Sequence, residues 1–253
     1  MHPRVNILGV GISAVNMDQA LDTIEQWIKA GSREYVCVAA SHSVMACRED
    51  PELRYIFNHS GLTTPDGMPM VWLARLYGHN HVTRVYGPDL MLAMSERSRQ
   101  ARHRYFLYGG TDVTLDHLAD KLTSSFLGLE IVGTYAPPFG PLTADEDKEI
   151  VGLINTARPD VVWVALGTGK QERWMAEHLR AIEAPVMIGV GAAFDFLSGQ
   201  VRQAPAWMRS AGLEWLFRLA IEPRRLAGRY AAYPLFVALV VAQLAGLRKY
   251  RLT

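Results

Sequence analysis

Asp160-Val-Val-Trp-Val-Ala-Leu-Gly-Thr-Gly169 is the stretch of sequence that decides the fold. A short apolar run that ends in glycines predicts a buried strand followed by a tight turn. The same pattern occurs at Arg104-Tyr-Phe-Leu-Tyr-Gly-Gly110 and at Pro185-Val-Met-Ile-Gly-Val-Gly191, and a helical pattern follows each of them. Three such units predict an α/β fold, with a Rossmann-like, mainly parallel sheet and helices on both faces.

Strand and helix patterns continue to alternate toward the N-terminus. Thr143-Ala-Asp-Glu146 is a capping box that starts the helix before the Asp160 strand. The other expected elements are a helix from Asn16 to about Ala30, a strand at Tyr35–Ala40, a helix from about Ser43 that restarts at Pro51, a strand at Leu62–Thr64, and helices that begin near Met68 and at Pro88.

The composition restricts the class of protein. The chain has 253 residues, of which 49% are hydrophobic and 20% charged, and these values exclude a disordered or collagen-like protein. Two cysteines, Cys37 and Cys47, form no CxxC pair and indicate a reducing compartment. The N-terminus has no apolar run long enough for a signal peptide, so we expect the first part of the chain in the cytoplasm.

The C-terminal part of the chain differs in charge from the rest. The formal net charge is +1, but residues 201–253 contain 9 basic and 2 acidic residues, which leaves a net charge of −6 on residues 1–200. Such an asymmetry suggests a polyanion or an anionic membrane as partner. We therefore expect an α/β domain at residues 1–200 and a basic, apolar helical appendage at residues 201–253.

The uncharged run Tyr230–Leu247 is the most distinctive part of the appendage. Its 18 residues reach the lower limit for a membrane-spanning helix, but Pro234 and Gln243 weigh against a span. A buried core helix is a second interpretation. We prefer a helix inserted at the membrane surface with its arginines at the lipid headgroups, and the sequence leaves open whether the run spans the bilayer.

Glycine-rich turns after parallel strands are suited to binding phosphate, because the backbone N–H groups of the following helix are free. Gly167-Thr-Gly-Lys170 is not a Walker A loop, since Gln171 stands where Ser or Thr must bind magnesium. Gly9-Val-Gly-Ile-Ser-Ala14 fits the dinucleotide fingerprint loosely. A nucleotide-dependent oxidoreductase is therefore one alternative function.

Two charged residues, Asp66 and Arg84, lie at positions where they can catalyse a reaction or bind a substrate. Asp66 lies between Pro65 and Gly67 at a strand-to-helix turn, where its carboxylate can act as a general base or simply cap the helix. The planar fork of Arg84 can hold a diphosphate or a sugar acid, or form an ion pair. His79-Asn-His81 has no nearby third ligand, and we expect neither a metal nor a cofactor.

Six segments, which follow one another over nearly the whole chain, form a recognisable set. They are Thr64-Pro-Asp-Gly-Met-Pro-Met-Val-Trp72, Arg84-Val-Tyr-Gly-Pro-Asp-Leu90, Tyr105-Phe-Leu-Tyr-Gly-Gly110, Pro159–Arg173, Gly189–Phe196 and Ala204–Arg225. Each is weak alone, but as a set they resemble the WecG/TagA/CpsF family of bacterial glycosyltransferases (glycosyltransferase family 26).

The resemblance implies a GT-E-like fold and an inverting, metal-independent transfer of a sugar from a UDP-sugar to a polyprenyl-diphosphate-linked sugar, in the synthesis of cell-surface polysaccharides. Such enzymes work at the cytoplasmic face of the bacterial inner membrane. The implied partners are the UDP-sugar, the lipid-linked acceptor and the membrane surface, which the appendage would contact. We expect no nucleic acid partner, and a homo-oligomer is left open. A non-catalytic, membrane-docked module that binds a UDP-sugar is the second alternative.

The resemblance also implies roles for single residues. Asp66 matches the family aspartate that would deprotonate the acceptor hydroxyl. The residues expected to bind substrate are His42, Arg84, Gly109, Gly110, Gly167, Thr168, Lys170, Gln171 and Asp195, and Arg84 matches an arginine near the donor diphosphate. The residues expected to bind the lipid diphosphate are Arg218, Arg224, Arg225 and Arg229.

One position departs from the family pattern. Many members have Thr-Pro-Asn after the strand that matches Tyr35–Ala40, and the asparagine contacts the substrate. Here Ala40 stands at the aligned position, followed by Ser41 and His42. His42 either takes over part of that role or simply starts the helix. The transferred sugar is therefore left open, although N-acetylmannosamine and its uronic acid are known donors in the family.

Overall fold

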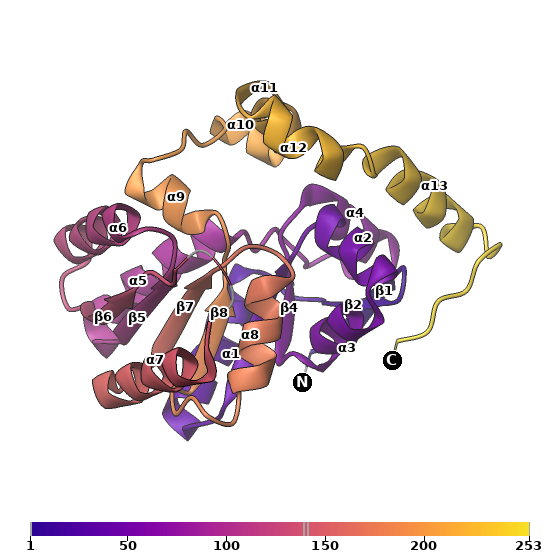
Figure 1. The fold of residues 1–253 in the computed structure, drawn as a ribbon. Helices are drawn as coiled ribbons and strands as arrows, with labels where there is room; N and C mark the ends of the chain where they lie inside the picture. Colours follow the sequence, from indigo (N-terminus) through magenta and orange to yellow (C-terminus); the bar gives the residue numbers. More distant parts are fainter. Residues whose placement is uncertain (1, 139, 141, 253) are drawn as a thin grey trace. The chain divides into compact units, whose positions relative to one another are not determined.

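A six-stranded sheet in the order β4-β3-β8-β7-β5-β6 forms the framework of the protein (Figure 1). The computed structural model describes residues 2–138, 140 and 142–252, and of Arg225, Ala227, Arg229 and Tyr230 it describes the backbone alone. The pairs β3/β8, β7/β8, β5/β7 and β5/β6 are parallel. The strands are β3 (Glu34–Ala39), β4 (Leu62–Pro65), β5 (Arg104–Gly109), β6 (Glu130–Tyr135), β7 (Val161–Ala165) and β8 (Val186–Gly189). The predicted α/β fold with a parallel sheet is confirmed.

The chain forms two compact units, and neither is continuous in sequence. The first contains Met1–Met17, Val38–Tyr86 and Gln203–Thr253, and the second contains Asp18–Cys37 and Gly87–Arg202. The strand β3 therefore begins in the second unit and ends in the first. The first unit thus collects the beginning, an early middle segment and the end of the chain.

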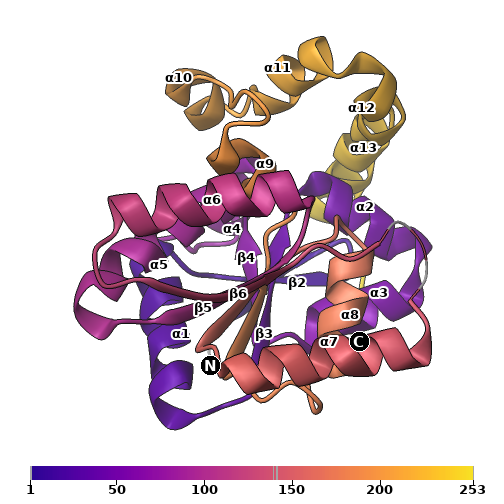
Figure 2. The ribbon, with the colours of Figure 1, turned by 60° about the vertical axis from the view of Figure 1, so that its left-hand side comes forward.

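The second unit contains the central strands and the helices that flank them. In Figure 2, α6 lies over one face of this part of the sheet, and α7 and α8 lie over the other. The strands β7 and β8 are almost fully buried, with Trp163 at 0% exposure, because helices cover both faces. The helices are α1 (Met17–Ala30), α5 (Gly87–Ala101), α6 (Asp112–Ser125), α7 (Ala144–Ala157), α8 (Lys170–His178) and α9 (Ala193–Ser198).

The first unit contains a hairpin that the sequence analysis missed. The strands β1 (Arg4–Ile7) and β2 (Val10–Ser13) pair in antiparallel fashion, and Leu8 and Gly9 form the turn with φ angles of 51° and 91°. A dinucleotide fingerprint requires a strand that leads through its glycines into a helix. Here Gly9 leads into a second strand, so the interpretation of Gly9-Val-Gly-Ile-Ser-Ala14 as a cofactor motif is wrong.

The described part of the first unit also contains seven helices, of which α3 and α4 pack against the hairpin. The predicted break at Asp50-Pro51 is present, because Asp50 ends one helix and its carboxylate accepts a hydrogen bond from the Leu53 N–H (3.0 Å) at the start of the next. These helices are α2 (Ser41–Glu49), α3 (Pro51–His59), α4 (Met68–Leu76), α10 (Ala206–Ser210), α11 (Glu214–Ile221), α12 (Pro223–Tyr230) and α13 (Tyr233–Leu244).

The uncharged C-terminal run forms α13, which is only 12 residues long. Phe236, Leu239 and Val240 are buried, while Val237 and Val241 are more than half exposed. Gln243, the polar residue inside the run, donates to the Asn6 carbonyl (2.7 Å) and accepts from the Leu8 N–H (2.9 Å), which fixes the helix to the hairpin. Among the described residues, no helix is both long and apolar enough to span a bilayer.

Candidate active site

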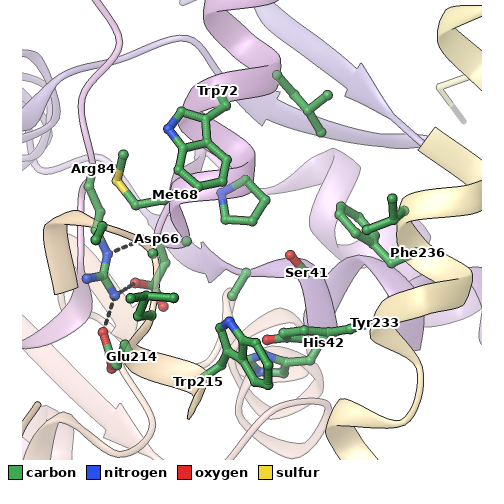
Figure 3. A pocket seen from close by; sticks show the side chains of 18 of the residues that line it. Ser41, His42, Asp66, Met68, Trp72, Arg84, Glu214, Trp215, Tyr233 and Phe236 are labelled. Carbon is green, nitrogen blue, oxygen red and sulfur yellow. Dashed lines mark hydrogen bonds and ion pairs between the residues drawn. The ribbon is translucent and has the colours of Figure 1, made fainter. Parts of the chain in front are cut away.

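Asp66 follows β4 directly and lies in a cavity of about 790 Å³ within the first unit (Figure 3). Its backbone N–H donates to the Ala39 carbonyl (3.0 Å), which fixes the residue beside the end of β3. Gly67, not Asp66, is the N-cap of α4, and the helix has no side-chain cap. The carboxylate of Asp66 is therefore not used as a helix cap and is available to the cavity.

Arg84 is held between two carboxylates. Its Nη2 lies 3.1 Å from Asp66 Oδ1 and 2.7 Å from Glu214 Oε2, and its Nε donates to the Asp66 carbonyl (Figure 3). The three side chains are 17%, 18% and 12% exposed, so solvent screens their charges only weakly. Asp66 thus has both its backbone and its side chain fixed by one guanidinium.

Tyr86 completes this charged cluster. Its hydroxyl donates to Glu214 Oε1 (3.0 Å) and accepts from Gln203 Nε2 (3.4 Å). The guanidinium of Arg84 lies 4.0 Å from the centre of the Tyr86 ring, in a cation–π arrangement. Arg84 and Tyr86 are two residues apart in the sequence, and both bind the same carboxylate of α11. Glu214 therefore attaches α11 to the segment 84–86, and Arg84 of this segment also binds Asp66.

Burial is the main cause that raises the pKa of Asp66 to about 6. The charge of Glu214 raises this pKa further, while Arg84 and Arg218 lower it. Burial acts to lower the pKa of Arg84, but Asp66 and Glu214 outweigh it, so the guanidinium stays charged. A carboxylate with a pKa near 6 is mostly ionised at neutral pH and is still basic enough to accept a proton, as a general base must.

A glycine brings α11 onto α4. Gly212 has a φ of 73°, and a Cβ at this position would lie 3.0 Å from Trp72 Cη2 and 3.2 Å from Met68 Cβ. A larger residue would therefore be strained in its backbone and crowded by two side chains of α4. This close approach places Glu214, two residues later, beside Arg84.

The rest of the cavity is partly basic and partly apolar. His42 of α2 lines it, together with Arg209 and Arg218. The predicted site residues Asp66, Arg84, His42 and Arg218 are thus brought to one cavity. Trp215 and the α4 side chains of Met68, Trp72 and Leu73 contribute apolar wall. The α13 side chains that line it are Tyr233, Pro234, Phe236, Val237, Val240 and Val241.

The other predicted substrate-binding residues lie in the second unit, after three neighbouring parallel strands. Gly109 ends β5, and with a φ of 117° it leaves no room for a Cβ, which would lie 2.4 Å from the Ala165 carbonyl oxygen. Gly167 and Gly169 follow β7 with φ angles of 85° and 90°. Because β5, β7 and β8 are parallel neighbours, these turns lie at the same edge of the sheet. The remaining predicted residues there are Gly110, Thr168, Lys170 and Asp195, the last in α9.

Gln171 and Glu172 begin α8 as a buried polar pair, 3% and 0% exposed. Gln171 Nε2 donates to Glu172 Oε1 (2.9 Å), and Glu172 Oε2 accepts from the Gly169 N–H (2.6 Å). Burial raises the pKa of Glu172. Gln171 Oε1 is buried and has no hydrogen-bond partner among the residues that the structure describes, so the predicted site residue Gln171 has an unused acceptor there.

The four predicted diphosphate-binding arginines are not equally placed. Arg218 lines the cavity, whereas Arg224 is exposed on α12. The side chains of Arg225 and Arg229 lie outside the described part of the structure. Within the described residues, no group of three or more His, Cys, Asp or Glu side chains lies close enough to hold a metal ion.

Sequence reasoning missed Glu214, Tyr86 and Glu172. Glu214 is one of only two acidic residues in the basic segment 201–253, and an isolated acid in such a segment is a signal for a specific ion pair. Tyr86 lies two residues after Arg84 and so could have been placed on the same side of an extended segment. Its partner is 128 positions away, and no local pattern reveals that contact.

Comparison with known proteins connects this geometry to an enzyme class. A family model described as the glycosyl transferase WecG/TagA/CpsF family matches residues 5–250. The protein of Bacillus subtilis named N-acetylglucosaminyldiphosphoundecaprenol N-acetyl-beta-D-mannosaminyltransferase is 30% identical over 181 residues, which are 71% of this chain and 68% of that one. The protein of the same name from Bacillus spizizenii is 28% identical over 193 residues, 76% and 73% of the two chains. The chain is a glycosyltransferase that belongs to the WecG/TagA/CpsF family.

Proposed function

We propose that this enzyme transfers N-acetylmannosamine from its UDP-linked form to an undecaprenyl-diphosphate-linked N-acetylglucosamine, with inversion at the anomeric carbon and without a metal. The names of the two Bacillus relatives support both sugars and the lipid carrier. The alternative of a nucleotide-dependent oxidoreductase fails, since its motif is a hairpin. The alternative of a non-catalytic module fails, since the family is one of transferases.

Asp66 is the general base of the proposed reaction. It accepts the proton of the acceptor hydroxyl while that oxygen forms a bond to the anomeric carbon. The bond from the anomeric carbon to the UDP oxygen breaks at the same time, and UDP leaves with the electron pair. One inversion follows from this single displacement. The observation that carries the proposal is the Asp66 carboxylate, which lies in a cavity, is fixed by Arg84 and has a pKa of about 6.

Cationic side chains replace a metal in this proposal. Arg84, Arg209 and Arg218 line the cavity that contains Asp66, and guanidinium groups bind diphosphate oxygens in a bidentate manner. We assign Arg84 to the donor diphosphate and Arg218 to the acceptor diphosphate, with Arg224, Arg225 and Arg229 as its neighbours in sequence. His42 would contact the transferred sugar in place of the family asparagine.

The donor nucleotide is assigned to the glycine turns of the second unit. Backbone N–H groups at Gly109, Gly110, Gly167, Thr168 and Lys170 can bind phosphate oxygens without a side chain. The buried carbonyl oxygen of Gln171 can accept one hydrogen bond from the donor, and Asp195 would face the nucleotide. In functional terms, residues 1–200 bind the UDP-sugar and catalyse transfer, and residues 201–253 bind the lipid diphosphate at the cytoplasmic membrane surface.

Replacement of the base tests the proposal directly. Asp66→Asn should lower kcat by about 10²–10⁴-fold, because the amide cannot accept the proton, while the Kd for UDP stays nearly the same. The measurements are release of UDP from UDP-N-acetylmannosamine in the presence of the lipid-linked acceptor, and calorimetry with UDP.

Asp116→Asn is the matched control, because Asp116 is exposed on α6 and is not a predicted site residue. It should keep the activity of the natural enzyme. Full activity of Asp66→Asn would contradict the role of Asp66, and full loss of activity after removal of metals with EDTA would contradict metal independence.

A further inference from the structure

We propose that the apolar half of the Asp66 cavity binds the first isoprene units of the acceptor's polyprenyl chain. The identity of the acceptor rests on the proposed function, and the inference adds that the start of the lipid chain has its own site on the protein. That site lies between α4, α11 and α13 in the first unit.

The two ends of the cavity match the two parts of such a lipid. Asp66, Arg84 and Glu214 group together, and Phe236 of α13 lies well apart from them (Figure 3). Arg218 adds positive charge near Asp66, since it lowers the pKa of that carboxylate. A diphosphate is therefore attracted to one end, and the hydrocarbon that is attached to it meets an apolar wall.

Part of the apolar wall is exposed. Trp72 is 51% exposed, and Val237 and Val241 are each 58% exposed, although all three line the cavity. Contact with hydrocarbon would remove this apolar surface from water, which is favourable in proportion to the area buried. The cavity volume of about 790 Å³ is in the range of small-ligand sites, so it can take several isoprene units beside the diphosphate.

The same helices carry apolar side chains that do not line the cavity. Leu76 of α4 is 67% exposed and Leu235 of α13 is 45% exposed, and neither belongs to the cavity wall. These residues can contact a membrane surface, but they cannot contact a ligand in the cavity. They therefore provide matched controls that separate binding of a lipid chain in the cavity from general attachment to a bilayer or a micelle.

A series of acceptors tests the inference. N-acetylglucosamine diphosphate would be attached to a prenyl, a farnesyl or an undecaprenyl chain, and kcat/KM would be measured in one detergent at fixed concentration. We expect kcat/KM to increase at least about tenfold from the prenyl to the farnesyl acceptor, and much less from farnesyl to undecaprenyl, because only the first units fit in the cavity.

Variants of the wall should remove this preference. In Val237→Gln and Trp72→Ala, the ratio of kcat/KM for farnesyl and prenyl acceptors should fall to near one. Leu235→Gln and Leu76→Ala should keep the ratio of the natural enzyme. Equal kcat/KM for prenyl and farnesyl acceptors in the natural enzyme, or an equal loss in Val237→Gln and Leu235→Gln, would overturn the inference. Thermal unfolding of each variant establishes that it is folded.

A binding measurement separates this inference from the proposed function. Calorimetry should show that farnesyl diphosphate binds at least about tenfold more tightly than inorganic diphosphate, and that Val237→Gln removes the difference. If no acceptor is glycosylated but this preference is present, the proposed function fails and the lipid site stands. If transfer occurs and chain length has no effect on kcat/KM or on binding, the lipid site fails and the proposed function stands.

Discussion

At the scale of single residues, burial and the charges of Arg84 and Glu214 determine how Asp66 ionises. Arg84 binds both Asp66 and Glu214, and Glu214 in turn accepts from Tyr86. Burial of the Asp66 carboxylate raises its pKa most, and the negative charge of Glu214 raises it further, against the lowering effect of Arg84. This explains why a carboxylate in contact with an arginine still has a pKa above its ordinary value.

The activity of the natural enzyme should fall as the pH falls through about 6, because the base must be ionised. Glu214→Gln removes a negative charge that raises the pKa of Asp66, so the acidic limb of the kcat profile should move to lower pH. Glu222→Gln, at the other acidic residue of segment 201–253, should leave the limb unchanged. If the acidic limb moved to higher pH in Glu214→Gln, the charge of Glu214 would not be what raises the pKa of Asp66.

Asp66 should also reduce the stability of the folded protein. Its pKa is about 6 in the fold, above the ordinary value of 3.8, so the folded state binds more protons than the unfolded state between these values. Stability therefore decreases as the pH rises through them. Above pH 6, ionised Asp66 lowers the free energy of unfolding by at most about 3 kcal/mol. Asp66→Asn should therefore raise the Tm at pH 8 and have a much smaller effect at pH 4. If Asp66→Asn instead lowered the Tm at pH 8, ionised Asp66 would not destabilise the folded protein.

At the scale of elements, strands with several apolar residues in a row were predictable, whereas the edge strand β6 and the two strands of the hairpin were not. The buried strand β7 and the capping box of α7 follow from local sequence. The edge strand β6 was missed because it is only partly buried, and its Gly133 leaves space that Phe106 fills. The hairpin was missed because Gly9 and Gly11 also fit a strand-to-helix motif.

The candidate site was predictable where its residues lie at turns next to strands. Asp66 and Arg84 were both recognised from short local motifs, and the structure places them in contact. Glu214 was not recognised, because its contact with Arg84 spans 130 positions of sequence. Long-range ion pairs of this kind depend on packing, here on Gly212 against α4, and leave no local periodicity.

Gln243 should control how firmly α13 is held. Gln243→Leu would leave the Leu8 N–H and the Asn6 carbonyl without their partner, at a cost of about 1–3 kcal/mol. Hydrogen exchange in α13 should become faster, and a protease specific for basic residues should cleave faster at Arg248. Leu244→Ala, which is adjacent and 43% exposed, serves as control and should change neither rate. Equal rates in Gln243→Leu and the natural protein would exclude this role.

At the scale of the whole molecule, the positive charge is concentrated near the C-terminus. Arg248, Lys249 and Arg251 are exposed after α13. Their joint replacement by glutamine should weaken binding to vesicles that contain anionic lipid several-fold at low salt, with little effect at high salt or on neutral vesicles. Replacement of Lys121, Lys148 and Arg180, which are exposed in the second unit, changes the net charge equally and should have little effect. Equal losses from both sets would mean that only net charge matters.

The discontinuous first unit also has a consequence for the order in which the protein becomes functional during its synthesis. The walls of the Asp66 cavity come from residues 40–86 and 209–241, so the cavity cannot close until residues 209–241 have left the ribosome. The second unit, by contrast, is complete at Arg202. Contacts of such large sequence separation form late, because a long loop must be closed first. A nascent chain that stops before residue 209 would therefore contain the glycine turns of the second unit but no assembled Asp66 cavity.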